Sequence, residues 1–240
     1  MNKLLNLALV MMSVFYSVSA SSAFVLNGTR YIYNGSKNGL SVEVTNYAER
    51  MYGGQIWIEN TADTPDIPFS VMPNMFTLKP ESKQKIQIAN LINDSLADDR
   101  ESMFWLNLQE IPSKDKNDAE TGNALILAAR TTVKLLYRPK SIEDGRNQAE
   151  EKMRITKQGD TLTLKNGTAY YFAVLSVNGH SVNEHDPLTA FKPFSQYTLS
   201  VPGVSNSVTF SAIDDWGAVR RYQCDLRETQ KQCQYQETVE

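Results

Sequence analysis

The chain has 240 residues and a formal net charge of −3, from 24 lysine and arginine residues against 27 aspartate and glutamate residues. This length suits one large or two medium domains. The near balance of charge argues against nucleic acid or an anionic membrane surface as the partner.

Residues 1–23 are typical of a secretory signal peptide. Lys3 precedes an uncharged apolar run over residues 4–18, and small residues follow it up to Ala23. Cleavage after Ala23 fits this pattern, and cleavage after Ala20 is an alternative. The run is shorter than the roughly 20 residues that span a bilayer. We therefore expect an exported, soluble mature chain with no membrane insertion.

The next segments alternate apolar and polar residues over short lengths, as strands do. The predicted strands are residues 24–33, 40–46, 54–60, 69–76, 84–89 and 102–111. Pro73 interrupts the fourth, which should make it an edge strand or one that changes sheet. Residues 102–111 are apolar on both faces, and we expect Trp57, Phe104 and Trp105 to pack in the core. Turns at this spacing indicate an immunoglobulin-like sandwich.

Residues 123–139 are predicted to form an unusually long strand, since strands commonly have about 5–6 residues. Leu125, Leu127 and Ala129 share one side with Val133 and Leu135. A strand of this length reaches past its own sheet and exposes an apolar edge, which monomers normally avoid. It is either buried within the chain or paired with another chain.

A second β-rich region follows a charged linker at residues 141–152. Its predicted strands are residues 161–166, 170–177, 197–201, 207–213 and 218–224. Cys224 and Cys233 are the two cysteines of the chain, and in an oxidising compartment they should form a structural disulfide. The prediction is all-β, with an N-terminal domain over residues 24–144 and a C-terminal domain over residues 145–240.

The sequence does not support catalysis. It contains no nucleophile elbow and no phosphate-binding glycine loop, and its two histidines, His180 and His185, lie in a turn-rich stretch. We predict that the chain is not an enzyme and that it binds no cofactor and no metal.

Several segments, in order along the chain, resemble the periplasmic pilus-assembly chaperones of the chaperone–usher pathway. These are residues 29–36, 71–80, 100–112, 133–139, 164–171 and 213–217. The resemblance implies two immunoglobulin-like sandwiches in an L-shaped, boomerang arrangement. It also implies a periplasmic chaperone that binds and stabilises fimbrial (pilin) subunits and delivers them to the outer-membrane usher.

The mechanism implied is donor-strand complementation, a form of β-augmentation in which the chaperone lends a strand to an incomplete subunit. On this reading Leu125, Leu127 and Ala129 face the subunit groove. Ala129 stands where the family usually has a large aliphatic residue, so one pocket would be filled less well. Without a subunit, the same edge would allow reversible self-association.

The resemblance also implies two charged sites. Arg30 and Lys134 match the pair that binds the carboxylate at the subunit's C-terminus. Glu101, Arg138 and Asp215 match a charge network between the domains. The short stretch over residues 113–122 resembles the short-loop subclass. The alternative is a secreted structural or adhesive immunoglobulin-like module, such as a fibre subunit.

Overall fold

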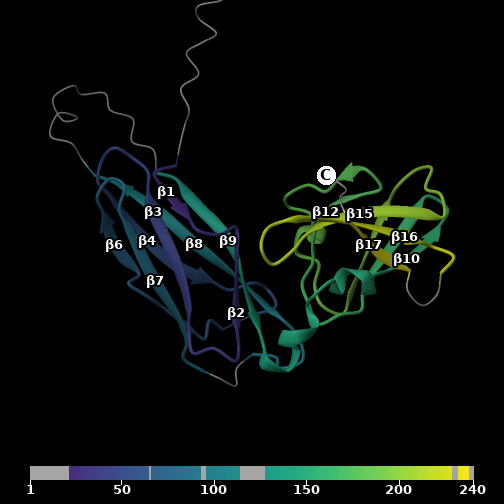
Figure 1. The fold of residues 1–240 in the computed structure, drawn as a ribbon, viewed down its shortest axis with the longest axis horizontal. Helices are drawn as coiled ribbons and strands as arrows, with labels where there is room; N and C mark the ends of the chain where they lie inside the picture. The colour runs from purple at the N-terminus through teal and green to yellow at the C-terminus, as the bar shows by residue number, and fades with distance from the viewer. Residues whose placement is uncertain (1–21, 65, 93–95, 114–127, 229–231, 238–240) are drawn as a thin grey trace, which may run out of the picture.

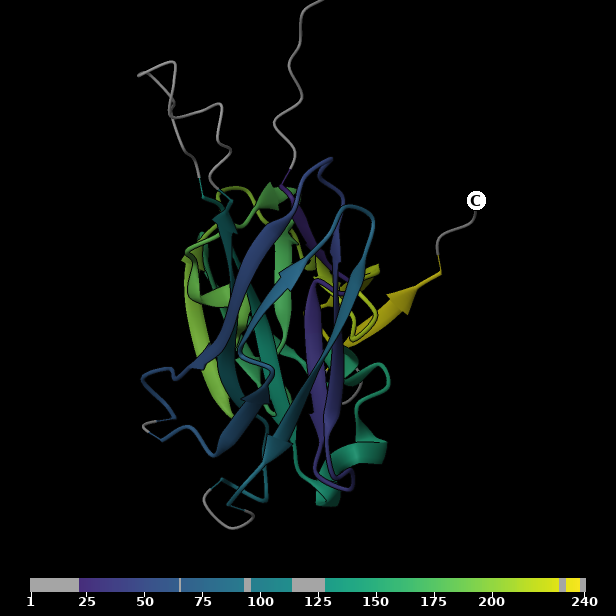
Figure 2. The same cartoon turned by 90° about the vertical axis from the view of Figure 1, so that its left-hand side faces the viewer.

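The computed structural model describes residues 22–64, 66–92, 96–113, 128–228 and 232–237. They form two β-sandwich domains that meet at an angle and are joined at one end (Figure 1). Figure 2 views the molecule from the first domain, whose blue and purple strands stand in front of the second domain. The predicted all-β, two-sandwich, L-shaped fold is confirmed.

The first domain packs a four-stranded sheet, in the order β1-β3-β7-β5, against a five-stranded sheet, in the order β2-β9-β8-β4-β6. Their bounds are β1 Phe24–Leu26, β2 Arg30–Asn34, β3 Leu40–Asn46, β4 Tyr52–Glu59, β5 Phe69–Met72, β6 Met75–Leu78, β7 Lys83–Asn90, β8 Ser102–Pro112 and β9 Arg130–Arg138. Alternation along each strand places one set of side chains between the sheets. Val42 and Ile86 from one sheet meet Phe104 and Leu135 from the other, all fully buried.

The stretch predicted as one strand over residues 24–33 is two strands, so that prediction is wrong. Phe24–Leu26 pairs with β3 in one sheet, and Arg30–Asn34 pairs with β9 in the other. The Asn27 side-chain oxygen stabilises the crossing by accepting hydrogen bonds from the Tyr31 hydroxyl and the Glu43 amide, at 2.8 and 3.0 Å. The crossing brings Arg30 next to β9.

Pro73 divides the predicted segment 69–76 as expected. Phe69–Met72 pairs with β7, whereas Met75–Leu78 pairs with β4 in the opposite sheet. The change of sheet predicted from the proline is therefore confirmed.

The second domain has a three-stranded sheet, β10-β11-β14, and a five-stranded sheet, β13-β12-β15-β16-β17. Their bounds are β10 Arg154–Gln158, β11 Thr161–Asn166, β12 Ala173–Val177, β13 His180–Ser181, β14 Ser195–Ser200, β15 Ser207–Ile213, β16 Val219–Asp225 and β17 Cys233–Gln236. The core between them includes Leu162, Val174, Val208 and Phe210. Strands β10, β13 and β17 were not predicted, because each is short or lacks a clean alternation.

A buried asparagine shapes the same corner in both domains. Asn46 and Asn166 are each 0% exposed and end β3 and β11. The amide nitrogen of each side chain donates to backbone carbonyls, such as Leu78 at 3.0 Å and Tyr170 at 2.8 Å. The side-chain oxygen of each accepts the backbone N–H two residues later, at 2.9 Å for Asn46 and 3.0 Å for Asn166. These bonds satisfy buried polar groups at a turn without proline.

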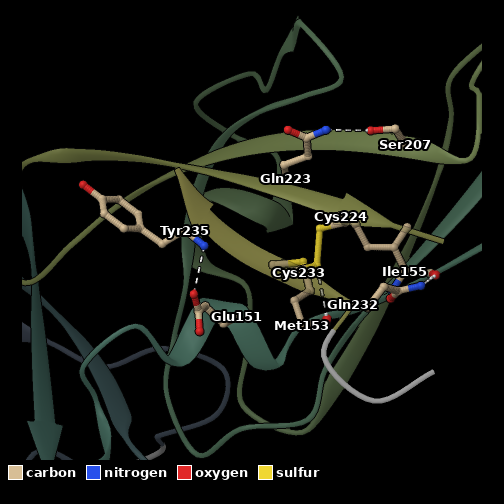
Figure 3. Close-up of a disulfide and its surroundings, with 9 residues drawn as sticks. All are labelled: Glu151, Met153, Ile155, Ser207, Gln223, Cys224, Gln232, Cys233 and Tyr235. Carbon is tan, nitrogen blue, oxygen red and sulfur yellow. Dashed lines mark hydrogen bonds between the residues drawn. A yellow bond between two sulfur atoms is a disulfide. The ribbon is translucent and has the colours of Figure 1, made fainter. Parts of the chain in front are cut away.

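The disulfide between Cys224 and Cys233 is confirmed, and it joins directly opposite residues of β16 and β17. Figure 3 shows how the neighbouring Gln232 extends this link. Its side chain accepts a hydrogen bond from the Ile155 amide at 2.7 Å and donates one to the Ile155 carbonyl at 2.8 Å. Because Ile155 lies on β10, the C-terminal strand connects the two sheets of this domain.

Candidate functional site

Arg30 and Lys134 are directly opposite each other in the parallel pair of β2 and β9. Opposite residues on neighbouring strands share one face of the sheet. Both side chains reach the second domain. Lys134 Nζ donates to the Thr189 carbonyl at 2.5 Å, and Arg30 Nη1 donates to the Ile213 carbonyl at 3.2 Å. The two cations therefore lie between the domains.

Within the described residues, neither cation forms an ion pair with a carboxylate. The Arg30 Nε atom is buried and has no hydrogen-bond partner there. Burial, and then the charge of Arg30, lower the pKa of Lys134 to about 8. Burial also lowers the pKa of Arg30, although the charge of Asp215 opposes this. An anion placed between the two cations would relieve both effects.

Strand β9 has an open edge beside this pair. On one side it pairs with β8 from Arg130 to Tyr137, and on the other it pairs with β2 only from Lys134 onward. In the described part of the chain, Arg130–Val133 therefore has unpaired backbone groups on the β2 side. Ala129 is described and exposed, and its carbonyl accepts the Glu110 amide at 2.9 Å. Leu125 and Leu127 lie outside the described residues.

The structure brings Glu101, Arg138 and Asp215 together at the junction of the domains. Arg138 contacts Glu101 at 2.7 Å and Asp215 at 2.8 Å, and the Arg138 and Glu101 side chains are 7% and 0% exposed. Glu101 also accepts the Tyr171 amide of the second domain at 2.7 Å. Burial raises the pKa of Glu101, and the Arg138 charge opposes that rise. An uncompensated charge at this depth would be strongly destabilising.

Two members of this network were missed in the sequence because they lie in the linker. The linker forms two short 3-10 helices, η2 Lys140–Gly145 and η3 Ala149–Lys152. Arg146 and Glu150 are buried, pair at 2.7 Å, and Arg146 also contacts Asp215 at 3.3 Å. The one available signal was their spacing of four residues, which allows an ion pair on a helical turn.

The expectation that Trp57, Phe104 and Trp105 all pack in the core is wrong for the two tryptophans. Phe104 is fully buried between the sheets, whereas Trp57 and Trp105 are half-buried. Trp105 lies opposite Lys134 and, with Met103 and Tyr197, lines a cavity of about 500 Å³ between the domains. The outer face of β8 is apolar because the second domain packs there.

The histidines predicted to lie in a turn-rich stretch are exposed. His180 belongs to the short strand β13, and His185 contacts only Glu184 among the described ion pairs, at 3.3 Å. Across the described ranges, no cluster of three or more histidine, cysteine, aspartate or glutamate residues could hold a metal ion. No helix in these ranges is both long and apolar enough to cross a bilayer.

Both domains match families of known proteins. Residues 23–143 match the family "Pili and flagellar-assembly chaperone, PapD N-terminal domain", and residues 148–224 match "Pili assembly chaperone PapD, C-terminal domain". The chaperone protein FanE of Escherichia coli is 40% identical over 229 residues, which cover 92% of this chain and 97% of FanE.

Solved structures of chaperones share the two-domain fold of this chain. The crystal structure of the periplasmic chaperone SfaE has a TM-score of 0.68 and 29% identity, and the match covers 83% of this chain and 98% of SfaE. A complex of SafA pilin with the SafB chaperone of Salmonella enterica shares the fold, with a TM-score of 0.74, 23% identity and coverage of 87% and 99%.

These matches decide between the two functions considered from the sequence. They cover both sandwiches of the chain and favour a chaperone over a structural module or fibre subunit. The matched proteins are chaperones of pilus assembly and not enzymes. The chain belongs to the family of PapD-like pilus-assembly chaperones.

Proposed function

We propose that this protein is a periplasmic chaperone that binds fimbrial subunits by donor-strand complementation and delivers them to an outer-membrane usher. The observation that carries the proposal is the Arg30–Lys134 pair, which has no carboxylate partner among the described residues and lies where the open edge of β9 begins. A chain that binds there can pair its backbone with β9 and place a terminal carboxylate between the cations.

The proposed anchor also implies a direction for the bound strand. With its carboxylate at Arg30 and Lys134, the rest of that strand would follow the open edge toward Arg130. The strand therefore runs parallel to β9 and continues the line of β2. The open edge leads into the segment that holds Leu125 and Leu127, whose side chains we propose for the subunit groove together with Ala129.

The buried network of Glu101, Arg138 and Asp215 has a supporting role in this proposal. It connects the end of β9 to the β15–β16 turn, and so fixes the second domain relative to the two cations. The two cations themselves also reach the second domain, where Lys134 donates to the Thr189 carbonyl and Arg30 donates to the Ile213 carbonyl.

The test is a periplasmic pull-down of the tagged chain, co-produced with the pilin encoded beside it. We expect a one-to-one complex with the wild type. Lys134→Ala should weaken it by about 2 kcal/mol or more, roughly thirtyfold, because one of the two charges on the carboxylate is removed. Lys85→Ala, an exposed lysine on β7, is the matched control and should bind as the wild type does.

The outcomes separate the parts of the proposal. Equal binding by the wild type and Lys134→Ala would refute the anchor while leaving the chaperone function in place. Failure of the wild type to bind would refute the chaperone function. The open edge can also pair with a second copy when no subunit is present, which sedimentation velocity of the free chain tests.

A further inference from the structure

We infer that Trp216 is a further contact for the bound subunit, a rigid aromatic surface for apolar side chains just before the subunit's terminal carboxylate. The inference rests on the proposed function and adds an interaction surface on the second domain. Four observations carry it: the exposure of Trp216, its position, the rigidity of its turn and the direction of the bound strand.

Trp216 is 86% exposed, more than any other large hydrophobic side chain in the described part of the chain. Trp57 and Trp105, in contrast, are half-buried against their own sheet. A tryptophan has a large apolar surface, and leaving it in water forgoes the gain from its burial. Aromatic side chains displayed in this way are frequent anchors of binding interfaces.

The turn that carries Trp216 lies against the first domain beside the cation pair. It joins β15 to β16, on the side of the second domain that faces the first (Figure 1). A Cβ atom at the next residue, Gly217, would lie 3.2 Å from the Thr29 hydroxyl. Arg30 follows Thr29 and donates to the carbonyl of Ile213, where the turn begins. Trp216 is therefore attached to the same junction as Arg30.

The turn is held by several contacts, and Trp216 lines a cavity of about 410 Å³ beside it with Arg138, Arg146 and Tyr235. One Asp214 oxygen accepts the backbone amides of Trp216 and Ala218 at 3.0 and 2.9 Å, and the other pairs with Arg220 at 2.8 Å. Asp215 is fixed by Arg138 and Arg146 at 2.8 and 3.3 Å. A side chain on such a turn loses little backbone entropy when it binds, which favours affinity.

The direction of the bound strand identifies the occupant. A strand that continues the line of β2 ends at Thr29 and Arg30, which is where Gly217 comes close to the first domain. Its last residues approach the turn of Trp216 as the carboxylate reaches Arg30 and Lys134. The partner is therefore the C-terminal segment of a pilin subunit, with a negative end and an apolar or aromatic side chain within the last few residues.

The first experiment uses the fluorescence of Trp216 in the full chain. Trp57→Phe and Trp105→Phe leave Trp216 as the sole tryptophan, since the chain has three. Addition of the co-encoded pilin should shift its emission to shorter wavelength and reduce quenching by acrylamide severalfold. A complex that forms without either change would overturn the inference.

The second experiment measures affinity. Trp216→Ala should weaken binding of the subunit about tenfold, as expected for an interface anchor, while Trp216→Tyr should retain most of the affinity. Leu91→Ala is the matched control, because Leu91 is 69% exposed and lies in the first domain at the end of β7. The melting temperature of free Trp216→Ala should equal that of the wild type.

The two proposals fail in different ways. Binding of Trp216→Ala with wild-type affinity would refute the contact and leave the chaperone function intact. Absence of binding by the wild type would refute the chaperone function and this role with it. Equal loss of affinity in Trp216→Ala and Leu91→Ala would also overturn the inference, because the effect would not be specific to this turn.

Discussion

At the scale of single residues, the site depends on two cations that destabilise each other. Arg30 and Lys134 are adjacent across β2 and β9, and both are partly removed from water. The alternating pattern of the sequence places Lys134 on the face opposite Leu135, but it does not reveal how deep either cation lies. That depth lowers the pKa of Lys134 and leaves the pair suited to a carboxylate.

The lowered pKa of Lys134 predicts a pH dependence of subunit binding. With a pKa of about 8, Lys134 is charged at neutral pH and loses its proton as the pH rises through 8. Binding of a terminal carboxylate should therefore weaken between pH 7 and 9.5. Titration calorimetry with a peptide from the C-terminus of the co-encoded pilin, at both pH values, measures this.

Lys134→Arg is the control for that titration, because arginine keeps its charge throughout the range. Its affinity should change little between the two pH values, and a peptide with an amidated C-terminus should bind the wild type weakly at both. The stability of the free protein should change in the opposite direction. The pKa of Lys134 is about 8 in the folded chain and near the ordinary 10.5 in the unfolded chain, so the unfolded chain binds more protons between pH 8 and 10.5. The free energy of unfolding should therefore rise with pH over that range. A wild-type affinity that does not depend on pH would contradict the prediction.

At the scale of elements, β9 has different neighbours along its length. From Lys134 onward it lies between β2 and β8, and Leu135, Leu136 and Tyr137 are all buried. Before Lys134 it has β8 on one side only. The alternation predicted a strand with two distinct faces, whereas the burial of both faces near its end results from the second domain packing on the outer one.

The C-terminal strand β17 and the residue before it, Gln232, hold the second domain together through the disulfide and the hydrogen bonds of the Gln232 side chain. Replacing Cys224 and Cys233 with serine should lower the free energy of unfolding of that domain by roughly 2.7 kcal/mol, because a loop of about 10 residues is no longer closed in the unfolded chain. Guanidinium unfolding followed by circular dichroism measures the difference.

The wild type under reducing conditions should match the double serine variant in that measurement. The first domain contains neither cysteine. In a Trp216→Phe background, the fluorescence of Trp57 and Trp105 should therefore show an unchanged unfolding transition for that domain. A reduced protein as stable as the oxidised one would contradict the role given to the bridge.

At the scale of the whole molecule, the angle between the domains depends on a buried network with few apolar contacts around it. Glu101 and Arg138 come from the first domain, Asp215 comes from the second, and Arg146 and Glu150 come from the linker between them. The apolar contact there is small, centred on Met103, Leu136 and Tyr171. The charges therefore contribute much of the geometry that positions the cations.

Arg138→Leu should loosen the arrangement of the domains. It leaves Glu101 buried without its cation, which should cost about 3–5 kcal/mol of stability, or be relieved by separation of the domains. Spin labels at Lys85→Cys and Lys165→Cys, one exposed position in each domain, should show a broader distance distribution than in the parent protein.

Arg220→Leu is the matched control for that measurement, because it removes an arginine that pairs with Asp214 within the second domain and is 42% exposed. It should leave the distance distribution narrow. If Arg138→Leu gave the same narrow distribution, the network would not set the angle.

The sequence by itself determined the local features of this protein. Alternation fixed most strands of both sandwiches, Pro73 marked the change of sheet, and the two cysteines fixed their own pairing, because each depends on residues close in the chain. Motifs in sequence order also identified the family and the candidate residues of the site, whose roles stay predictions.

Only the tertiary structure decided which side chains are buried or exposed where segments distant in the sequence meet. From the sequence, Arg146 and Glu150 belong to a charged linker, but in the folded chain both are buried. Trp105 was predicted to lie in the core, but it lines the cavity between the domains. The exposure of Trp216 could not be read from its neighbours either. Burial is a property of contacts between distant segments, and alternation records only which side of its own strand a residue occupies.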